Sequence, residues 1–390
     1  MRIKSTAKKI IFFILEKLPL KRNYIFFESY PELDGSPWMI YQEMINRGLD
    51  KRYKLRWLVD DSFKNPPNVP CVHFFNTKTI FEKISCYCLL AKAKVIIDSN
   101  RYVYKINQKT FRLYTRHGAP LKNDYFYSSK LGVVDAVLSI SEELCNIQEK
   151  LFPSAKGKFI TLGYPTNDRL FENVDLYKIG FWRKLTGQND KFDKIIGWLP
   201  TYRQHRNGGE AEESSFIHPY GIPLIKNKDE FEKLNKILKE KNALLAIQMH
   251  HAQSKNFPDY CYSNIILIPQ SLKYEMSIST VNLMKSFDAM ITDYSSAYHE
   301  FLLLDRPIGL SIDDYDIYCE KPGFSLDFFE WIKGFYMRNF DDLTVFVNDT
   351  LEGRDISRFQ RESALQRIHK YKDAKSTMRV MDFLIRSAKL

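Results

Sequence analysis

An apolar strand runs directly into a helix in the segment AMITDYSSAYHEF, residues 289–301. The first four residues form a short apolar run typical of a buried parallel strand, and residues 295–304 have the pattern of a helix. The turn between them carries Asp293, Ser295 and Ser296. Free backbone N–H groups and the positive end of a helix dipole favour an anion at such a turn. Alternatively, Asp293 or Ser295 only caps the helix, and one terminus can serve both purposes.

The same alternation of short apolar runs and helical stretches extends over the chain on both sides of this segment. Strands are expected at 24–27, 55–59, 72–75, 95–98 and 111–115, and again at 194–199, 244–249, 265–268, 289–292 and 307–311. Helical runs separate many of them, such as 38–46, 78–92 and 229–241. This pattern predicts an α/β protein with two doubly wound, Rossmann-type halves. Such sheets bind ligands outside the carboxyl ends of their strands.

Four parts are expected along the 390 residues. These are a basic amphipathic helix at 1–22, a first α/β domain at 23–180, a second at 190–354 and a basic helical segment at 355–390. A chain of this length is expected to form two domains with separate cores. The composition, 44% hydrophobic and 27% charged, is that of a globular protein and excludes disordered, collagen-like and membrane-bundle classes.

The formal net charge of +11 lies at the two ends of the chain. Residues 1–22 and residues 354–390 each carry a net +6, which leaves −1 for everything between them. Basic ends suit attraction to nucleic acid or to an anionic membrane surface. We expect no nucleic-acid partner, because no binding module and no interleaving of aromatic and basic residues is present. Merely solvated basic ends remain an alternative.

The N-terminal segment has the pattern of an amphipathic helix. Apolar residues from Ile3 to Leu18 recur at helical spacing, with lysines elsewhere around the helix. The unbroken apolar run, residues 10–15, is too short to span a bilayer, and no cleavage site of a signal peptide follows it. The pattern favours a helix in the membrane interface, with a helix packed on the protein's own surface as the alternative.

The segment RHGAPLK, residues 116–122, follows an expected strand. Imidazole is well matched to accepting a proton from an alcohol near neutral pH, so His117 is a candidate base, although a lone histidine is often structural. Lys122 could place its charge beside a phosphate. In GYPTND, residues 163–168, Asn167 and Asp168 could face a cleft or cap a helix.

Two further strand ends carry polar groups. Thr201 and Arg203 follow the strand at 194–199 and could bind phosphate oxygens, with a solvated arginine as the alternative. His250 ends the strand at 244–249, and its neighbour His251 points to the opposite side, so the pair is no metal site. The carboxylates of residues 313–316 are expected to be solvated, so we assign no metal. Neither a P-loop, GxGxxG nor GxSxG is present, which argues against kinases, dehydrogenases and serine hydrolases.

Together these motifs resemble the CDP-glycerol/CDP-ribitol polyol-phosphate transferases of teichoic acid and capsule synthesis. The family's WHGTPLK is similar to RHGAPLK here, its GYPRND to GYPTND, its APTWR to LPTYR at 199–203 and its KxHP to QMHH at 248–251. Its ITDYSS is intact at 291–296, and the order of the motifs holds from about residue 23 to 328. Arg116, Thr166 and His251 depart from the family pattern, which leaves the acceptor and the polyol open.

The resemblance implies a GT-B-like fold with two Rossmann-type domains facing across a cleft. His117 would be the general base and His250 a second essential histidine at the diphosphate. The remaining candidates fall into a donor-diphosphate group of Thr201, Arg203, Asp293, Ser295 and Ser296, and an acceptor or cleft group of Arg116, Lys122, Asn167 and Asp168. In GT-B folds the C-terminal helix crosses back to the first domain, so we expect the two basic ends to share one membrane-facing surface.

The activity implied by the resemblance is transfer of glycerol phosphate from CDP-glycerol to a hydroxyl of a lipid-linked saccharide, of the undecaprenyl diphosphate type, with release of CMP. No cofactor is implied beyond the CDP-glycerol or CDP-ribitol donor. The implied location is peripheral, on the cytoplasmic face of the membrane, in teichoic acid or capsular polymer synthesis. Three alternatives stay open: a ribitol-phosphate transferase, a GT-B glycosyltransferase using a nucleotide sugar, and a non-catalytic membrane-associated binding protein.

Overall fold

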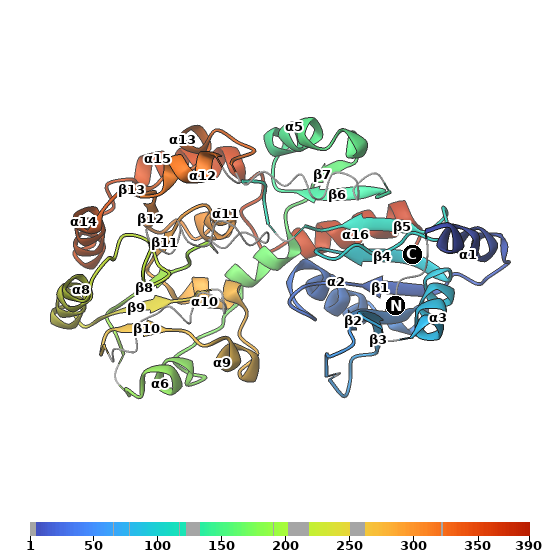
Figure 1. Ribbon diagram of the computed structural model, residues 1–390, viewed down its shortest axis with the longest axis horizontal. Helices are drawn as coiled ribbons and strands as arrows, with labels where there is room; N and C mark the ends of the chain where they lie inside the picture. The colour runs from blue at the N-terminus through green and yellow to red at the C-terminus, as the bar shows by residue number, and fades with distance from the viewer. Residues whose placement is uncertain are drawn as a thin grey trace. The chain divides into compact units, whose positions relative to one another are not determined.

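The structure is a computed structural model, which describes residues 5–64, 66–77, 79–116, 118–121, 133–189, 191–201, 218–249, 262–320 and 323–390. The chain divides into two compact units (Figure 1). Unit 1 comprises Met1–Ala119, Asp124–Phe171 and His369–Leu390, and unit 2 comprises Pro120–Asn123 and Glu172–Ile368. The C-terminal segment therefore returns to the unit in which the chain begins.

Unit 1 is built on a parallel sheet with the strand order β3-β2-β1-β4-β5-β6-β7 in its described residues. The strands are β1 (Tyr24–Phe27), β2 (Lys54–Asp60), β3 (Cys71–Phe75), β4 (Ala93–Asp98), β5 (Phe111–Tyr114), β6 (Ala136–Ser139) and β7 (Phe159–Thr161). The helices are α1 (Ser5–Lys17), α2 (Gly35–Asn46), α3 (Ile80–Leu90), α5 (Glu142–Leu151) and α16 (Ser376–Ala388), with short 3₁₀ segments η1 (Leu49–Lys51), η3 (Pro153–Ala155) and η4 (Pro165–Phe171).

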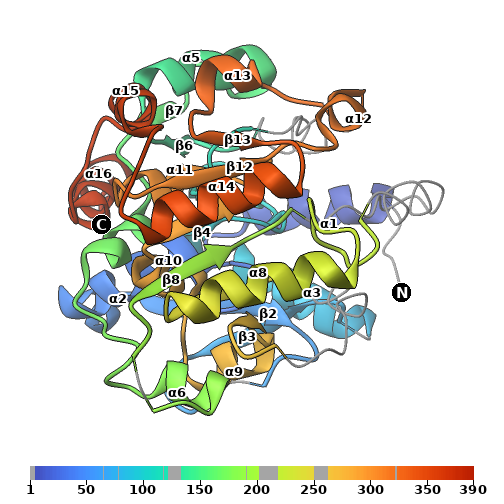
Figure 2. The ribbon, with the colours of Figure 1, turned by 90° about the vertical axis from the view of Figure 1, so that its left-hand side faces the viewer.

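Helices cover both faces of the unit 1 sheet. The chain moves outward from β1 to β2 and β3 and then returns to β4, on the other side of β1. Because parallel crossovers are right-handed, this reversal places α2 and α3 on opposite faces. Figures 1 and 2 show α1 on the side of α3, and α16 on the side of α2. A capping box at Thr79 and Glu82 fixes the start of α3.

Unit 2 repeats the architecture with the order β10-β9-β8-β11-β12-β13. Its strands are β8 (Lys194–Trp198), β9 (Ala243–Ile247), β10 (Ile265–Leu267), β11 (Ala289–Thr292), β12 (Ile308–Ser311) and β13 (Phe335–Met337). Its helices are α6 (Phe181–Thr186), α8 (Lys228–Glu240), α9 (Gln270–Glu275), α10 (Thr280–Ser286), α11 (Ala297–Leu302), α12 (Tyr315–Glu320), α13 (Phe328–Trp331), α14 (Phe340–Leu351) and α15 (Arg358–Ile368).

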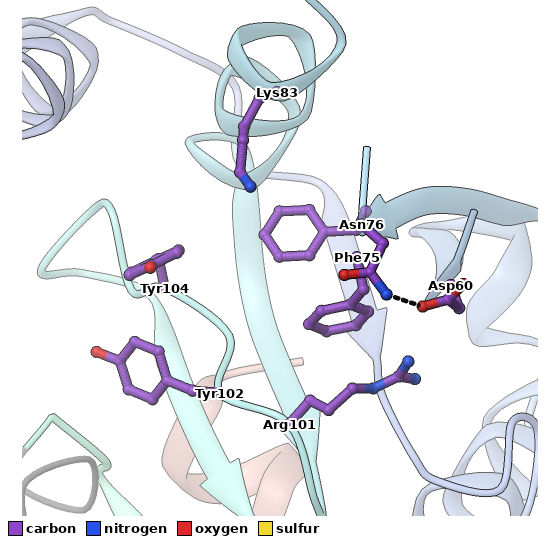
Figure 3. Close-up of a pocket in the computed structure, with 8 residues that line it drawn as sticks. Asp60, Phe75, Asn76, Lys83, Arg101, Tyr102 and Tyr104 are labelled. Atoms are coloured by element: carbon purple, nitrogen blue, oxygen red, sulfur yellow. Dashed lines mark hydrogen bonds between the residues drawn. The ribbon is translucent and has the colours of Figure 1, made fainter. Parts of the chain in front are cut away.

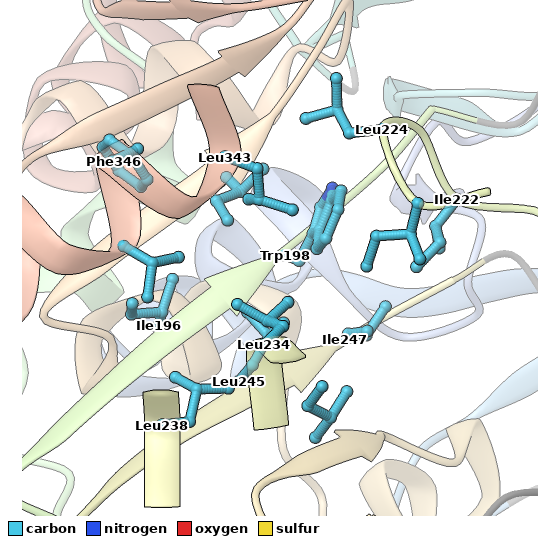
Figure 4. Packing of buried hydrophobic residues seen from close by; sticks show 14 of the residues in the cluster. Ile196, Trp198, Ile222, Leu224, Leu234, Leu238, Leu245, Ile247, Leu343 and Phe346 are labelled. Atoms are coloured by element: carbon cyan, nitrogen blue, oxygen red, sulfur yellow. The ribbon is translucent and has the colours of Figure 1, made fainter. Parts of the chain in front are cut away.

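The core of unit 2 lies between this sheet and the helices α8 and α14 (Figure 4). Trp198 is fully buried there, with Leu234 from α8 and Leu343 from α14 around it. On the other face, a Cβ atom at position 197 would lie 2.1 Å from the ring of Phe287, so only glycine fits in the middle of β8.

The α/β prediction with two parallel sheets is confirmed, and the ten expected strands are all present. Three strands of three or four residues were not predicted, namely β6, β7 and β13. The helix expected at 295–304 is shorter, since α11 ends at Leu302 and turns follow it.

The expectation that the two basic ends share one membrane-facing surface stays a prediction. Burial, Arg22 and Lys389 all lower the pKa of Lys94, so one residue of each basic end lies near it. Helices α1 and α16 belong to the same unit but cover opposite faces of its sheet (Figure 2). Helix α1 buries Leu15 against the apolar cluster beneath it and leaves Ile10, Phe13 and Ile14 more than half exposed. It is therefore packed on the protein along one edge only. No helix in the described parts of the chain is long and apolar enough to span a bilayer.

Candidate active site

The segment after β11 lies at the reversal point of the unit 2 sheet. Strand β8 leads outward to β9 on one side, and β11 leads to β12 on the other, so the loops after β8 and β11 diverge from neighbouring strands. Open α/β sheets bind ligands at such a point. The carboxylate of Asp293, fully buried, accepts hydrogen bonds from the backbone N–H of Thr201 at 3.0 and 2.8 Å. It thus joins the two loops.

Asp293 acts as a positioning residue in these two bonds, because they go to the backbone of Thr201. A second link supports it, since the Thr292 hydroxyl donates to the carbonyl of Leu199 at 2.9 Å. The polar groups of this turn that remain partly exposed belong to Ser295 and Ser296. The Ser295 hydroxyl accepts from the N–H of Ala297 at 3.3 Å, and Ser296 is the first flanking residue of α11, without a side-chain cap bond. Two partly exposed hydroxyls are therefore held next to the Thr201 loop.

A polar network extends from this turn to the loop after β12. Tyr294 donates its hydroxyl proton to Asp314 at 2.9 Å, and its buried ring lies 4.0 Å from that of Tyr318. Asp313 bonds to Nε2 of the buried His218 at 3.0 Å and accepts from the N–H of Leu224 at the same distance. The tyrosine of the DYSS turn is therefore a structural anchor for the loop after β12.

His218, Asp313 and Asp314 bring their possible ligand atoms within 4.8 Å of one another, which is the grouping in the described residues that could hold a metal ion. The carboxylates of 313 and 314 were expected to be solvated, and that is wrong, because both are used in the network above. His218 was not identified from the sequence, since its partners lie about 95 residues further along the chain.

One acidic residue of the 289–301 segment lies in the interior. Glu300, on α11, is only 8% exposed. Burial raises the pKa of its carboxyl from 4.5 to about 8, with only its own backbone N–H opposing the shift. The residue therefore carries its proton at neutral pH and adds no negative charge near Ser295 and Ser296.

In unit 1, Arg116 follows β5 with a left-handed backbone (φ 58°) and is 6% exposed. Its Nε donates to the carbonyl of Gly118 at 3.2 Å, and its guanidinium lies 5.7 Å from the ring of Phe152. The side chain thus packs inside unit 1 and braces the loop that leads to position 117. Its assignment as an acceptor or cleft residue stays a prediction.

Asp168 also has a structural task. It is buried in η4, and its two carboxylate oxygens accept from the backbone N–H groups of Ser376 and Thr377 at 3.0 and 2.8 Å. Asp168 thereby caps α16, a helix more than 200 residues away. A Cβ atom at Gly163 would lie 2.4 Å from the Ser376 hydroxyl, which explains the glycine. The capping alternative is confirmed for Asp168, and the neighbouring Asn167 is buried as well.

Two buried ion pairs at the carboxyl ends of the unit 1 strands were missed. Asp98, the last residue of β4, is fully buried and pairs with Arg112 of β5, whose Nε lies 3.2 Å from both carboxylate oxygens. Burial lowers the pKa of Arg112, but the Asp98 carboxylate outweighs it and the net direction is upward. Glu28, directly after β1, pairs with Arg101 at 2.9 Å. The sequence contains a signal for the first of these pairs, because Arg112 is a charged residue within an otherwise apolar strand run.

Four predicted residues, His117, Lys122, Arg203 and His250, lie outside the described residues. Of the others, the structure brings together Thr201, Asp293, Ser295 and Ser296 in unit 2. It assigns Arg116 and Asp168 to packing and capping in unit 1, where Asn167 is buried beside Asp168. Of these seven described residues, five are buried, and only Ser295 and Ser296 are partly exposed.

Comparison with known proteins identifies a family. The family described as CDP-Glycerol:Poly(glycerophosphate) glycerophosphotransferase matches residues 10–386. The chain is 26% identical over 373 residues to the teichoic acid glycerol-phosphate transferase of Staphylococcus aureus (strain NCTC 8325 / PS 47), over 86% of this chain and 88% of that protein. It is 23% identical over 385 residues to the teichoic acid poly(ribitol-phosphate) polymerase of Bacillus spizizenii (strain ATCC 23059 / NRRL B-14472 / W23), over 95% of this chain and 58% of that protein.

A solved structure of the wall teichoic acid polymerase TagF has a TM-score of 0.75 to this chain at 19% identity, over 98% of this chain and 94% of that one. At this identity the likeness concerns the fold alone. Together with the two parallel sheets, it confirms the predicted GT-B-like class.

Proposed function

Because this chain belongs to the CDP-glycerol:poly(glycerophosphate) glycerophosphotransferase family, whose members are teichoic acid polyol-phosphate transferases, we propose that it transfers glycerol phosphate from CDP-glycerol to a saccharide hydroxyl. The hydroxyl oxygen attacks the phosphorus that carries the glycerol. A new P–O bond forms, the bond from that phosphorus to the bridging oxygen breaks, and CMP leaves with the bridging oxygen. The hydroxyl proton passes to a base, for which we propose His117.

The observation that carries this proposal is the turn after β11. Asp293 fixes the N–H of Thr201, and Ser295 and Ser296 present hydroxyls beside it at the reversal point of a parallel sheet. Serine hydroxyls beside a loop that a buried carboxylate fixes suit the oxygens of a diphosphate. The protonated Glu300 supports this, because an ionised carboxylate nearby would repel a diphosphate. Arg203 and His250 would add positive charge and a further donor, since phosphoryl transfer depends mainly on positioning and charge stabilisation.

The choice of glycerol over ribitol follows the family description and the glycerol-phosphate transferase of S. aureus, which matches over most of both chains. The ribitol-phosphate polymerase of B. spizizenii matches over 58% of its own length, so CDP-ribitol is the donor to test against. We propose that the acceptor saccharide is lipid-linked, and that α1, with its exposed apolar side chains, holds the enzyme at the cytoplasmic face of the membrane.

The test is release of CMP by the purified full-length chain, given a lipid diphosphate disaccharide and either CDP-glycerol or CDP-ribitol. We expect release with CDP-glycerol, loss of release in His117→Ala, and a fall of about a hundredfold in kcat/KM when Ser295 and Ser296 are both changed to Ala. Ser286→Ala is the matched control, because that hydroxyl only caps the end of α10 by donating to Leu283. No CMP with either donor and a competent acceptor would refute the transferase. Release of UDP or GDP from a nucleotide sugar would indicate a glycosyltransferase.

A further inference from the structure

A hollow of about 280 Å³ opens at the carboxyl ends of β2, β3 and β4 in unit 1, apart from every motif that the sequence singled out. Figure 3 shows its lining, which comes from the ends of β2 and β3, the first turns of α3 and the loop after β4. Its lining includes Asp60, Phe75, Asn76, Lys83, Tyr102 and Tyr104. Its size is near the lower end for small-molecule sites, roughly 300–1,000 Å³, which leaves room for one sugar ring and its substituent.

The walls of the hollow are aromatic and firmly held. Tyr102 and Tyr104 form one side, with ring centroids 5.1 Å apart, and Phe75 lies across from them (Figure 3). Tyr104 contacts Phe12 of α1 at 5.5 Å between centroids. The guanidinium of Arg101 lies 4.0 Å from the Phe75 ring. Both walls are therefore fixed before any ligand arrives, which lowers the entropic cost of binding.

Arg101 shapes the hollow without offering its charge to a ligand. Its guanidinium donates to Glu28 at 2.9 Å, to Glu32 at 2.6 Å and to the carbonyl of Ser29 at 2.9 Å. Two carboxylates thus neutralise it. Lys83 differs, because its ammonium has no hydrogen-bond or ion-pair partner within the described residues, and Figure 3 shows it directed toward the rings. The available positive charge of the lining therefore stands at one end of the hollow, and a second lysine, Lys8 of α1, lies 4.5 Å from the ring of Tyr104.

The opposite side supplies groups that bind hydroxyls. The Asn76 amide donates to Asp60 at 2.6 Å, and Asp60 also accepts from the N–H and hydroxyl of Ser62 at 3.0 and 2.8 Å. These bonds orient an amide and a carboxylate side by side. A pyranose ring presents C–H groups on its faces and hydroxyls at its edge, so it matches aromatic walls with an amide and a carboxylate at the rim. A phosphate attached to that ring matches the ammonium of Lys83.

We propose that this hollow binds a saccharide ring together with the phosphate attached to it, as in the head of the acceptor. The assignment to the acceptor rests on the function proposed above, whereas the binding of a sugar phosphate does not. The saccharide ring lies between the tyrosines and Phe75, and its phosphate lies at Lys83.

The binding test uses the full-length chain with glucose 1-phosphate, glucose and inorganic phosphate as probes in isothermal titration calorimetry. We expect glucose 1-phosphate to bind at least tenfold more tightly than either of the other two. Lys83→Gln should weaken it about tenfold, the size of one charge-assisted hydrogen bond, and leave glucose binding unchanged. Tyr102→Leu should weaken both sugars. Lys92→Gln, at the other end of α3 and equally half-buried, is the matched control and should change nothing.

Each other outcome contradicts a stated part of the proposal. Equal binding of inorganic phosphate leaves a phosphate site without saccharide recognition, and equal loss in Lys92→Gln shows a general charge effect. A melting temperature equal to that of the wild type confirms that each variant is folded. In the CMP-release assay, glucose 1-phosphate should compete with the acceptor but not with CDP-glycerol. If glucose 1-phosphate binds without competing with the acceptor, the hollow is not the acceptor site. If it binds to a protein that releases no CMP, the transferase function is refuted, but the sugar-phosphate site in the hollow is supported.

Discussion

The two basic ends of the chain carry the same formal charge and use it differently. In residues 354–390, cations form ion pairs with carboxylates of the protein, such as Arg361 with Asp305 and Asp355, Arg367 with Glu330, and Lys370 with Glu142. In α1, the described lysines form no ion pair within the described residues. Lys8 contacts the ring and hydroxyl of Tyr104, and Lys17 lies over Phe13. Most C-terminal cations thus stabilise the fold through ion pairs, whereas the lysines of α1 are available to a partner.

The largest effect is expected from removing a buried C-terminal cation. Arg361 is 1% exposed and pairs with Asp305 at 2.8 Å and with Asp355. Arg361→Met leaves both carboxylates without their partner and should lower the free energy of unfolding by about 3–5 kcal/mol, measured by urea denaturation. Arg358→Met, which breaks only an exposed pair with Glu362 one turn along α15, should cost under about 0.5 kcal/mol. Equal effects would mean that the C-terminal charges are not structural.

The second prediction concerns the opposite end. Changing the exposed Lys9, Lys17 and Lys21 to Gln should weaken binding to vesicles containing anionic lipid by about 1 kcal/mol per lysine, with little change in stability. Wild-type binding should weaken as salt rises, and the variant should lose that dependence. The control variant changes Lys375, Arg386 and Lys389, exposed at the other end, to Gln. If co-sedimentation shows the same loss for both variants, the two ends are equivalent after all.

A smaller effect is expected at Asp168, which caps the C-terminal helix α16. Asp168→Ala removes the acceptor for the N–H groups of Ser376 and Thr377 and should lower stability by roughly 2 kcal/mol. CMP release per folded molecule should change less than twofold, because Asp168 lies in the helix anchor. Asp382→Ala, on the exposed side of α16, is the control. A large loss of turnover in a folded Asp168→Ala protein would instead support the original prediction that Asp168 belongs to the acceptor site.

The smallest effect concerns a buried acid, Glu300, which holds a proton in place of its formal negative charge. Glu300 has a pKa raised from 4.5 to about 8 by burial, so the folded state holds a proton that the unfolded state releases above pH 4.5. The stability that this group contributes is complete below pH 4.5, falls progressively as the pH rises toward 8, and falls no further above that pH. Glu300→Gln should therefore equal the wild type near pH 4, and its advantage in the free energy of unfolding should grow by roughly 1 kcal/mol between pH 5 and pH 6, by thermal unfolding. Glu240→Gln, exposed on α8, should show no such difference.

Much of the fold was predictable because each signal is local. Short apolar runs gave β2, β4 and β8, and the run into Asp293 gave the unit 2 turn. The short strands β6, β7 and β13 were missed, although β10 is equally short and was predicted. Among site residues, Thr201, Asp293, Ser295 and Ser296 were predicted together, and Asp293 does bond to Thr201. His218 was missed because its partner lies 95 residues away, and the Asp98–Arg112 pair was missed although Arg112 is a charge within an apolar run.

The sequence by itself determined the family, the two parallel sheets and the strand ends at which polar groups gather. Motifs and hydrophobic periodicity depend only on residues that are close together along the chain, so they can be recognised without the structure. Only the tertiary structure decided what those groups do. Whether Asp168 caps a distant helix, whether Arg361 is neutralised, whether Glu300 keeps its proton and whether Lys83 stands beside aromatic walls all depend on burial and on partners far along the chain. Burial removes water, and without water a charge is governed by its nearest neighbours in space.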